Sequence, residues 1–223
     1  MKFLLSLVFV LCGFQYAQAQ SSSNRMQIKQ TLKSTTKRSA KPDYRFTMNF
    51  NNSRLAKVAA GNQNKLRKTG FEFVRVFDMA GMPWESGLAY ETLGGRFVEE
   101  GFSSAIEISY LTIPLLRRSN LGRVGDFDVV AIWGGRLAIQ SEAEVKDTVV
   151  LGSTSTSQRN DLEEFVEEYD IRSSLGISLE SKAANTLGFS TGLQWQRGTR
   201  NLVEGTGPKS VIDTLAFNIG MLF

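Results

Sequence analysis

The side chains of this chain that could do chemistry are its carboxylates, lysines and arginines. The sequence has no histidine, which removes the usual general base and the commonest metal ligand. Its single cysteine, Cys12, lies in an apolar segment that we expect to be removed, which would leave the mature chain without thiol chemistry or disulfides. Charged groups of both signs recur at alternate positions of strand-like segments and could pair in a desolvated space. They are Glu85, Glu91, Glu107, Asp128, Arg136, Asp170, Arg172 and Glu180.

The densest acidic run is 161–170, DLEEFVEEYD. Carboxylates are ligands for divalent cations, and a cation bound here would help to contact lipopolysaccharide phosphates, but carboxylates alone do not define a site. We interpret the run as a solvated loop that enters a strand. Asp/Glu protease chemistry at a barrel rim stays open, but no catalytic constellation stands out. We therefore predict a protein that is not an enzyme, with no catalytic, cofactor-binding or metal residues and no cofactor.

The segment 210–223 predicts the kind of element that carries these groups. From Thr214 onward it alternates, with one face apolar and the other small or polar, and a period of two is typical of a strand. The apolar face carries Leu215, Phe217, Ile219, Met221 and Phe223. About ten alternating residues let a tilted strand cross a bilayer. We expect the strand ending at Phe223 to be recognised by a barrel-insertion machinery.

Similar segments recur between turn signals, and eight strands are predicted in all. They are 44–51, 71–78, 84–93, 104–116, 127–140, 169–180, 186–196 and 210–223. No apolar run is long enough for a membrane-spanning helix. An even number of strands returns both ends of the chain to one side of a membrane. The pattern predicts an all-β fold, an eight-stranded antiparallel up-and-down transmembrane β-barrel.

Two residues interrupt the alternation. Arg75 shares a face with Phe71, Phe73 and Phe77, so it lies near a membrane interface or a bulge shifts the register. Pro114 cannot donate to a strand ladder, so we expect it to mark a strand end or a bulge.

The connections differ in length in a regular way. The two longest, 52–70 and 141–168, are the first and fifth, whereas the short ones, 79–83 and 181–185, are the second and sixth. Outer-membrane barrels have short periplasmic turns and longer external loops. We therefore expect the odd-numbered connections to be external, although 117–126 is long for a periplasmic turn.

The start of the chain predicts its compartment. Residues 1–19 have the charged start, apolar stretch and Ala17-Gln18-Ala19 site of a signal peptide. Residues 20–43 form a basic segment, poor in apolar residues, that we interpret as a disordered periplasmic linker. The basic charge is confined to that linker, so we predict no nucleic-acid partner. Residues 44–223 are the predicted outer-membrane barrel.

The position of the apolar face distinguishes two kinds of barrel. A lipocalin-like soluble barrel has an apolar lumen and a polar exterior, whereas a membrane barrel is inverted. The chain offers aromatic residues for the two bilayer interfaces: Trp84, Trp133, Trp195, Tyr44, Tyr90, Tyr110 and Tyr169. Eight strands leave a lumen that side chains fill, so we predict no open pore. The long inward candidates are Arg136, Arg172, Gln194 and Gln196.

Four segments and the terminal residue also resemble a known family. The segments 107-EISYLTIPLLRR, 127-FDVVAIWGGRL, 168-EYDIRSSLGISLE and 186-TLGFSTGLQW, with the terminal phenylalanine, resemble the PorT-like outer-membrane β-barrel domain family of Bacteroidetes. The resemblance covers about residues 44–223 and implies an eight-stranded barrel in the outer membrane, without a particular role.

The sequence thus leads to two functional hypotheses. The first is an integral outer-membrane barrel of non-enzymatic role: membrane integrity, surface interaction or an accessory part of an envelope or secretion complex. Its expected partners are outer-membrane lipid and lipopolysaccharide, and no specific protein partner follows from the residues. The alternative is a soluble periplasmic lipocalin-like barrel that binds an apolar ligand.

Overall fold

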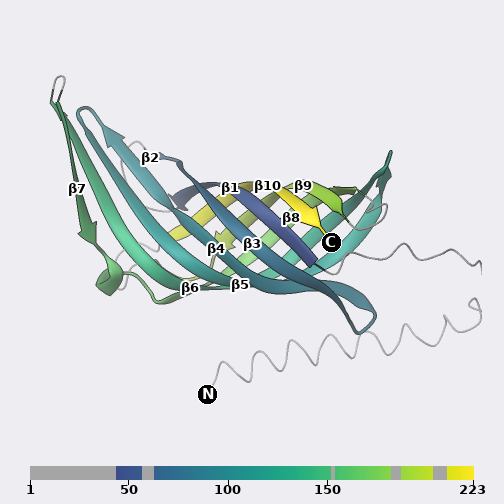
Figure 1. The fold of residues 1–223 in the computed structure, drawn as a ribbon. Helices are drawn as coiled ribbons and strands as arrows, with labels where there is room; N and C mark the ends of the chain where they lie inside the picture. The colour runs from purple at the N-terminus through teal and green to yellow at the C-terminus, as the bar shows by residue number, and fades with distance from the viewer. Residues whose placement is uncertain (1–43, 57–62, 152–153, 182–186, 203–209) are drawn as a thin grey trace, which may run out of the picture. The chain divides into compact units, whose positions relative to one another are not determined.

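The computed structural model describes residues 44–56, 63–151, 154–181, 187–202 and 210–223. The predicted signal peptide and linker therefore lie outside the described residues. Ten strands and one short 3-10 helix, η1, follow one another along the chain (Figure 1). They are β1 (Tyr44–Ala56), β2 (Gln63–Asn64), β3 (Leu66–Met79), β4 (Met82–Glu99), β5 (Phe102–Val124), β6 (Phe127–Leu151), β7 (Thr154–Asp161), η1 (Glu163–Phe165), β8 (Tyr169–Ser181), β9 (Gly188–Gly198) and β10 (Val211–Leu222).

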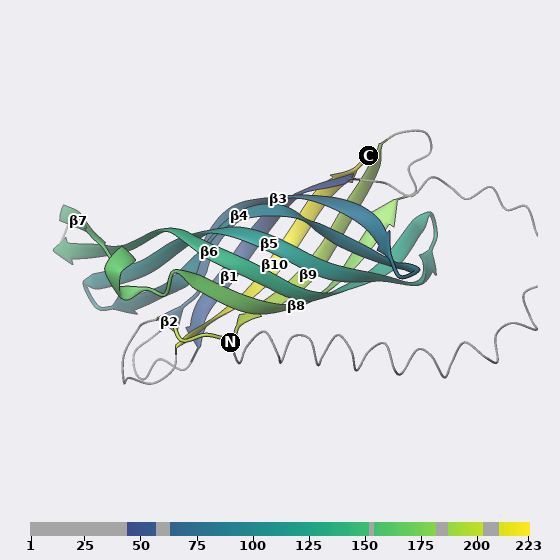
Figure 2. The ribbon, with the colours of Figure 1, turned by 90° about the horizontal axis from the view of Figure 1, so that it is seen from below.

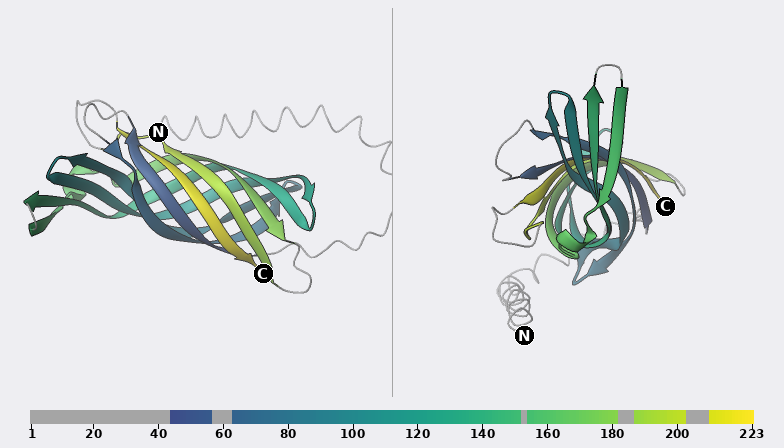
Figure 3. Two further views of the ribbon diagram at one scale, coloured as in Figure 1. Left: turned by 90° about the horizontal axis from the view of Figure 1, so that it is seen from above. Right: turned by 90° about the vertical axis from the view of Figure 1, so that its left-hand side faces the viewer.

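Eight of these strands close into a barrel. Each pairs antiparallel with the next in the order β1, β3, β4, β5, β6, β8, β9, β10, and β10 pairs back with β1 (Figure 3). The short strands β2 and β7 add to β4 and β6. The prediction of an all-β, eight-stranded, antiparallel up-and-down barrel is confirmed, and each predicted strand corresponds to one barrel strand.

The alternation of side chains separates the two surfaces of the barrel wall. In β8, Asp170, Arg172 and Ser174 are buried, whereas Ile171 and Leu175, at the alternate positions, are exposed. β10 repeats the arrangement, with Ala216 fully buried and its neighbours Leu215 and Phe217 exposed. Polar side chains thus face the lumen and apolar side chains face outward. This arrangement contradicts the lipocalin-like alternative, which requires an apolar lumen.

We call the outward-facing apolar residues of the barrel strands the apolar belt. Every barrel strand contributes to it, and one exposed member from each strand in turn is Phe50, Phe71, Leu88, Leu111, Leu137, Ile177, Leu193 and Ile219. The stretch of β8 from Tyr169 to Leu179 is about 33 Å long at roughly 3.3 Å per residue, and a tilt of about 40° leaves a height of about 25 Å. The belt therefore has the height that the hydrocarbon layer of an outer membrane requires.

Aromatic side chains lie along both margins of the apolar belt. Tyr44 and Phe223 are exposed where β1 begins and β10 ends, and Tyr169 is exposed where β8 begins, whereas Trp133 and Trp195 both lie opposite Leu175, within the belt. The prediction for Tyr110 was wrong, because it is buried in the lumen. It shares its face of β5 with the buried Thr112, so its position follows from the alternation.

Arg75 lies at a margin of the belt rather than at a bulge. Its register is continuous with both neighbouring strands, opposite Tyr44 on β1 and Ser86 on β4. The guanidinium lies over the Tyr44 ring, 5.9 Å from its centroid. Of the two explanations that the sequence left open, the interface position is the one observed.

Pro114 neither ends its strand nor lies at a bulge, so that prediction was wrong. β5 continues through it, with Pro114 opposite Arg136 of β6. On the other side, the pairing of β4 with β5 passes from Ser86↔Leu115 to Ala89↔Thr112 and omits Pro114. A residue without an N–H group fits where the ladder is interrupted.

One end of the barrel, which we call the Tyr44 end, holds Tyr44 and Phe223, whose backbones exchange hydrogen bonds of 2.9 and 3.0 Å. The turns at Ala80-Gly81 and Gly125-Asp126 lie at this end. The long connection expected over 117–126 is instead mostly strand, since β5 runs to Val124 and β6 starts at Phe127. Both turn residues Ala80 and Gly81 have positive φ, of 53° and 75°, as a tight hairpin turn of this twist requires.

At the opposite end, the far end, four strands continue past the rest of the barrel (Figure 1 and Figure 2). We call residues 92–99, 102–109, 142–151 and 154–161 of β4, β5, β6 and β7 the strand extension. β3 last pairs with β4 at Glu91, whereas β4 and β5 remain paired to Glu99 and Phe102. The predicted long connection 141–168 is thus largely strand, in β6 and β7. The odd-numbered connections all join strands at the far end, as the predicted order requires.

Candidate functional site

The lumen of the barrel holds a cluster of buried charges, which we call the lumen network. Its members lie on the inward faces of β1, β3, β4, β5, β6 and β8. It comprises four arginines and five carboxylates: Arg45, Arg118, Arg136, Arg172, Glu72, Glu85, Glu91, Asp170 and Glu180. With nearly equal numbers of each sign, the buried charges can compensate one another, as a desolvated site requires.

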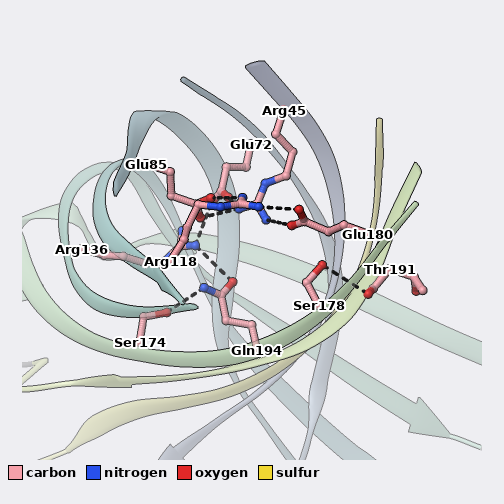
Figure 4. Close-up of polar contacts among 10 residues, drawn as sticks. All are labelled: Arg45, Glu72, Glu85, Arg118, Arg136, Ser174, Ser178, Glu180, Thr191 and Gln194. Atoms are coloured by element: carbon pink, nitrogen blue, oxygen red, sulfur yellow. Dashed lines mark hydrogen bonds and ion pairs between the residues drawn. The ribbon is translucent and has the colours of Figure 1, made fainter. Parts of the chain in front are cut away.

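One part of the network centres on Arg45 and Glu85 (Figure 4). Arg45 donates to Glu85 and, at 3.2 Å, to Glu72. Arg118 donates to the other oxygen of Glu85 at 2.8 Å and also to Glu180. Two of these contacts join neighbouring strands, whereas Arg45–Glu85 and Arg118–Glu180 join strands that do not pair, so they brace the barrel across its lumen.

Arg136 extends this part toward β9. Its Nη2 lies 2.6 Å from Oε2 of Glu72 and donates to Gln194 at 3.1 Å. Gln194 in turn donates to the Ser174 hydroxyl at 2.7 Å (Figure 4). The long side chains of Arg136 and Gln194 therefore occupy the middle of the lumen.

A second part of the network centres on Arg172. Its guanidinium donates to Glu91 at 2.7 Å and to Asp170 at 3.1 Å, and lies over the Tyr110 ring at 4.0 Å from the centroid. Thr112 donates to Glu91 at 3.2 Å. Asp170 also accepts a bond from the backbone of Thr199, so this part holds the segment that follows β9.

Apolar side chains pack beside the network toward the far end. Leu55, Leu93 and Ile108 are almost fully buried there, together with Val166 and Leu202 from outside the barrel strands. Leu162 also packs against them, so the acidic run 161–170 is more than a solvated loop. Its apolar residues Leu162 and Val166 fold inward, whereas its glutamates at 163 and 164 stay exposed.

These two layers leave little free space in the lumen. A hollow beside Arg45 and Gln194 has a volume of about 10 Å³, near the minimum that holds one water molecule. The predicted inward residues Arg136, Arg172, Gln194 and Gln196 are each at most 4% exposed. The geometry is that of a packed interior, as expected for eight strands.

Most of the charged residues singled out from the sequence meet in this network. Glu85, Glu91, Arg136, Asp170, Arg172 and Glu180 belong to it. Glu107 does not, because it shares the outward face of β5 with Leu111, and its carboxylate lies 2.6 Å from Nζ of Lys68. Asp128 also lies elsewhere, at the Tyr44 end, where it accepts a bond from Arg123.

Sequence reasoning did not single out three members of the network. Arg45 and Glu72 each stand between two aromatic residues, which was a usable signal for an inward position. Arg118 lay in the segment expected to be a turn, so no face was assigned to it. The continued pairing of Arg118 with Ile132 on β6 places it inside.

The described residues offer neither a metal centre nor a helical span. They contain no group of three or more His, Cys, Asp or Glu side chains that could hold a metal ion. Among the same residues, no helix has the length and apolar character needed to cross a membrane.

Three solved structures are similar to this chain. They are Neisserial surface protein A (8% identity, 81% of this chain and 97% of that chain, TM-score 0.45), the attachment invasion locus protein Ail of Yersinia pestis (10%, 82% and 99%, 0.39) and the N-terminal β-barrel domain of Pseudomonas aeruginosa OprF (9%, 81% and 98%, 0.27). At these identities and TM-scores the matches do not indicate a function. No protein-family profile and no curated protein matches the chain.

Proposed function

We propose that this protein is an integral outer-membrane β-barrel with a non-enzymatic role. The observation that carries the proposal is the inversion of the barrel: an apolar belt outside and a paired charge network inside. Exposing so many large apolar side chains to water would be costly, whereas lipid accommodates them. A closed barrel also satisfies its backbone hydrogen bonds internally, as a bilayer requires.

The compartment follows from the same proposal. Closed barrels of this type are the β-structures that span membranes, and the predicted signal peptide would carry the chain across the inner membrane. Insertion by a barrel-assembly machinery through the strand ending at Phe223 is part of the proposal. So is membership of the PorT-like family, which the resembling segments support.

The role that we propose is mechanical or interactive. The lumen network braces the wall and leaves no evident path for a solute, which favours membrane integrity, surface interaction or an accessory part of an envelope complex over transport. The strand extension gives such a role a candidate surface at the far end.

Cell fractionation combined with gel mobility tests the proposal. The protein should sediment with the outer membrane, and an unboiled sample should migrate differently from a boiled one, because a closed barrel resists detergent until heated. A control sample unfolded in urea before loading should migrate like the boiled one. Recovery in the soluble periplasmic fraction, with no effect of boiling, would overturn the membrane assignment.

A further inference from the structure

A basic cavity lies at the far end, outside the lumen network. Its volume is about 750 Å³, within the range of small-molecule sites. The residues around it include Lys65, Arg67, Lys68, Arg96 and Lys146, with Glu107 as the single acid. Five cations against one carboxylate give this cavity a formal charge of +4, although residues 42–223 as a whole carry more acids than bases.

Strand pairing places these cations together. Arg96 of β4 is opposite Ala105 of β5, which is opposite Lys146 of β6, so the three form a row across the strand extension. Lys65 directly precedes β3, and Arg67 is the second residue of β3. Both line the cavity. Three of the five cations come from the run 65–68, and the fold brings Arg96 and Lys146, which are distant in sequence, beside them.

Two of the five cations have partners among the residues around the cavity. Lys68 lies 2.6 Å from Glu107, and Arg96 donates to the Ser103 hydroxyl at 2.9 Å. Within the described part of the chain, the side chains of Lys65, Arg67 and Lys146 have no hydrogen-bond or ion-pair partner. Like charges held close together repel, and an anion between them relieves that repulsion.

The cavity also adjoins the apolar belt. A neighbouring cavity of about 460 Å³ shares Arg67 and Lys68 with it and reaches Phe50. Phe50 is an exposed belt residue of β1, opposite Thr69 of β3. A ligand with phosphate groups and acyl chains could therefore place its phosphates among the cations and its chains along the belt.

We propose that this basic cavity binds the phosphate groups of a phosphorylated glycolipid in the leaflet around the far end of the barrel. Clusters of lysine and arginine beside a membrane are suited to anionic head groups, and arginine pairs with phosphate through two parallel bonds. The proposal rests on the membrane assignment above and names the chemistry of the lipid partner. Phosphate is the recognised group, and the continuity with Phe50 selects a lipid over a free phosphate.

The test uses the full barrel refolded in a non-ionic detergent, with diphosphoryl lipid A as the probe. A triple variant, K65Q/R67Q/K146Q, removes the three unpartnered cations. The control R159Q/R197Q/R200Q removes the same charge at the same end, from arginines paired with Glu144, Asp213 and Glu167. We expect the apparent Kd for lipid A to rise at least about tenfold in the first variant and less than about threefold in the control, since only the first variant loses charge-assisted contacts with phosphate.

Three further arms separate the possible outcomes. Dephosphorylated lipid A should bind far more weakly than the diphosphoryl form, and inorganic pyrophosphate should compete only weakly. Pyrophosphate binding as tight as that of lipid A, with the same dependence on the variant, would replace the lipid with a soluble anion and overturn the proposal. Equal Kd values for both triple variants, or for both forms of the lipid, would also overturn it.

Gel mobility of each variant, heated and unheated, shows whether the barrel is intact. If the triple variant does not fold, the single variant K146E takes its place, and lipid A binding unchanged by K146E would contradict the site. A folded, heat-modifiable barrel that fails to bind lipid A would refute this proposal and leave the membrane assignment standing. A protein that never folds in detergent would instead refute the membrane assignment.

Discussion

Glu85 shows why the lumen network depends on every member. Its two oxygens accept from Arg45 and Arg118, and the carboxylate is fully buried. A buried pair is not a large source of stability by itself, because desolvation offsets the attraction. Removing one partner is different, since the remaining charges stay buried without compensation.

We predict that Glu85→Gln destabilises the refolded barrel by about 3–5 kcal/mol, because two arginines lose their shared anion. Denaturant unfolding in detergent micelles measures the change in the free energy of unfolding. Asp128→Asn is the matched control, since its partner Arg123 is half exposed and such surface pairs contribute about 0–1 kcal/mol. Equal losses in the two variants would contradict the bracing role of the network.

At the residue scale, the sequence could predict which face of a strand a charged side chain lies on. It could not always predict that the residue lies in a strand. Asp170, Arg172 and Glu180 were predictable because they alternate with apolar residues in β8. Glu107 lies four residues from Leu111 in β5, so alternation places both on the outward face, but Glu107 was grouped with the inward charges. Its outward position makes it part of the basic cavity instead.

Strand ends were the least predictable elements, for a physical reason. Alternation of apolar and polar residues is needed only at the height of the apolar belt, where one face of a strand points outward and the other points into the lumen. Beyond that height, backbone pairing alone continues β5 to Val124 and β6 to Leu151, with mostly polar side chains. A pattern of apolar residues carries no information about such polar strand, so residues 94–99, 142–151 and 154–161 of the strand extension were expected to be loop.

The apolar belt gives an element-scale prediction about β10. Phe217→Asp should prevent the accumulation of heat-modifiable barrel, because it places a carboxylate among the exposed apolar residues Leu215 and Ile219. A basic residue at the bilayer midplane costs about 2–4 kcal/mol and an acidic one somewhat less. The level of heat-modifiable barrel in the outer-membrane fraction is the measurement.

Phe165→Asp is the matched control for this change. Phe165 is 60% exposed in η1 at the far end, outside the barrel strands, so the same substitution there should be tolerated. Wild-type levels from Phe217→Asp, or an equal loss from both variants, would show that the outward face of β10 does not meet lipid.

The packed lumen gives a prediction for the whole molecule. Purified, refolded protein in a planar lipid bilayer should show no stable conductance, because Arg136, Arg172, Gln194 and Gln196 fill the space that an ion would need. A general porin measured in the same bilayers controls for detection. Reproducible steps of porin size would mean that the lumen opens in a membrane.

The orientation of the barrel is the last property that the topology predicts. Ser155 of β7 and Asp126 in the turn between β5 and β6 are both exposed and lie at opposite ends. We expect the far end to face outside, since the longer connections of outer-membrane barrels are external. A cysteine at Ser155 should therefore react with a membrane-impermeant maleimide on intact cells, and one at Asp126 only after the outer membrane is broken. The unsubstituted protein measures any background from Cys12. Labelling of the Asp126 cysteine alone on intact cells would reverse the orientation, and equal labelling of both would contradict a barrel that spans the membrane.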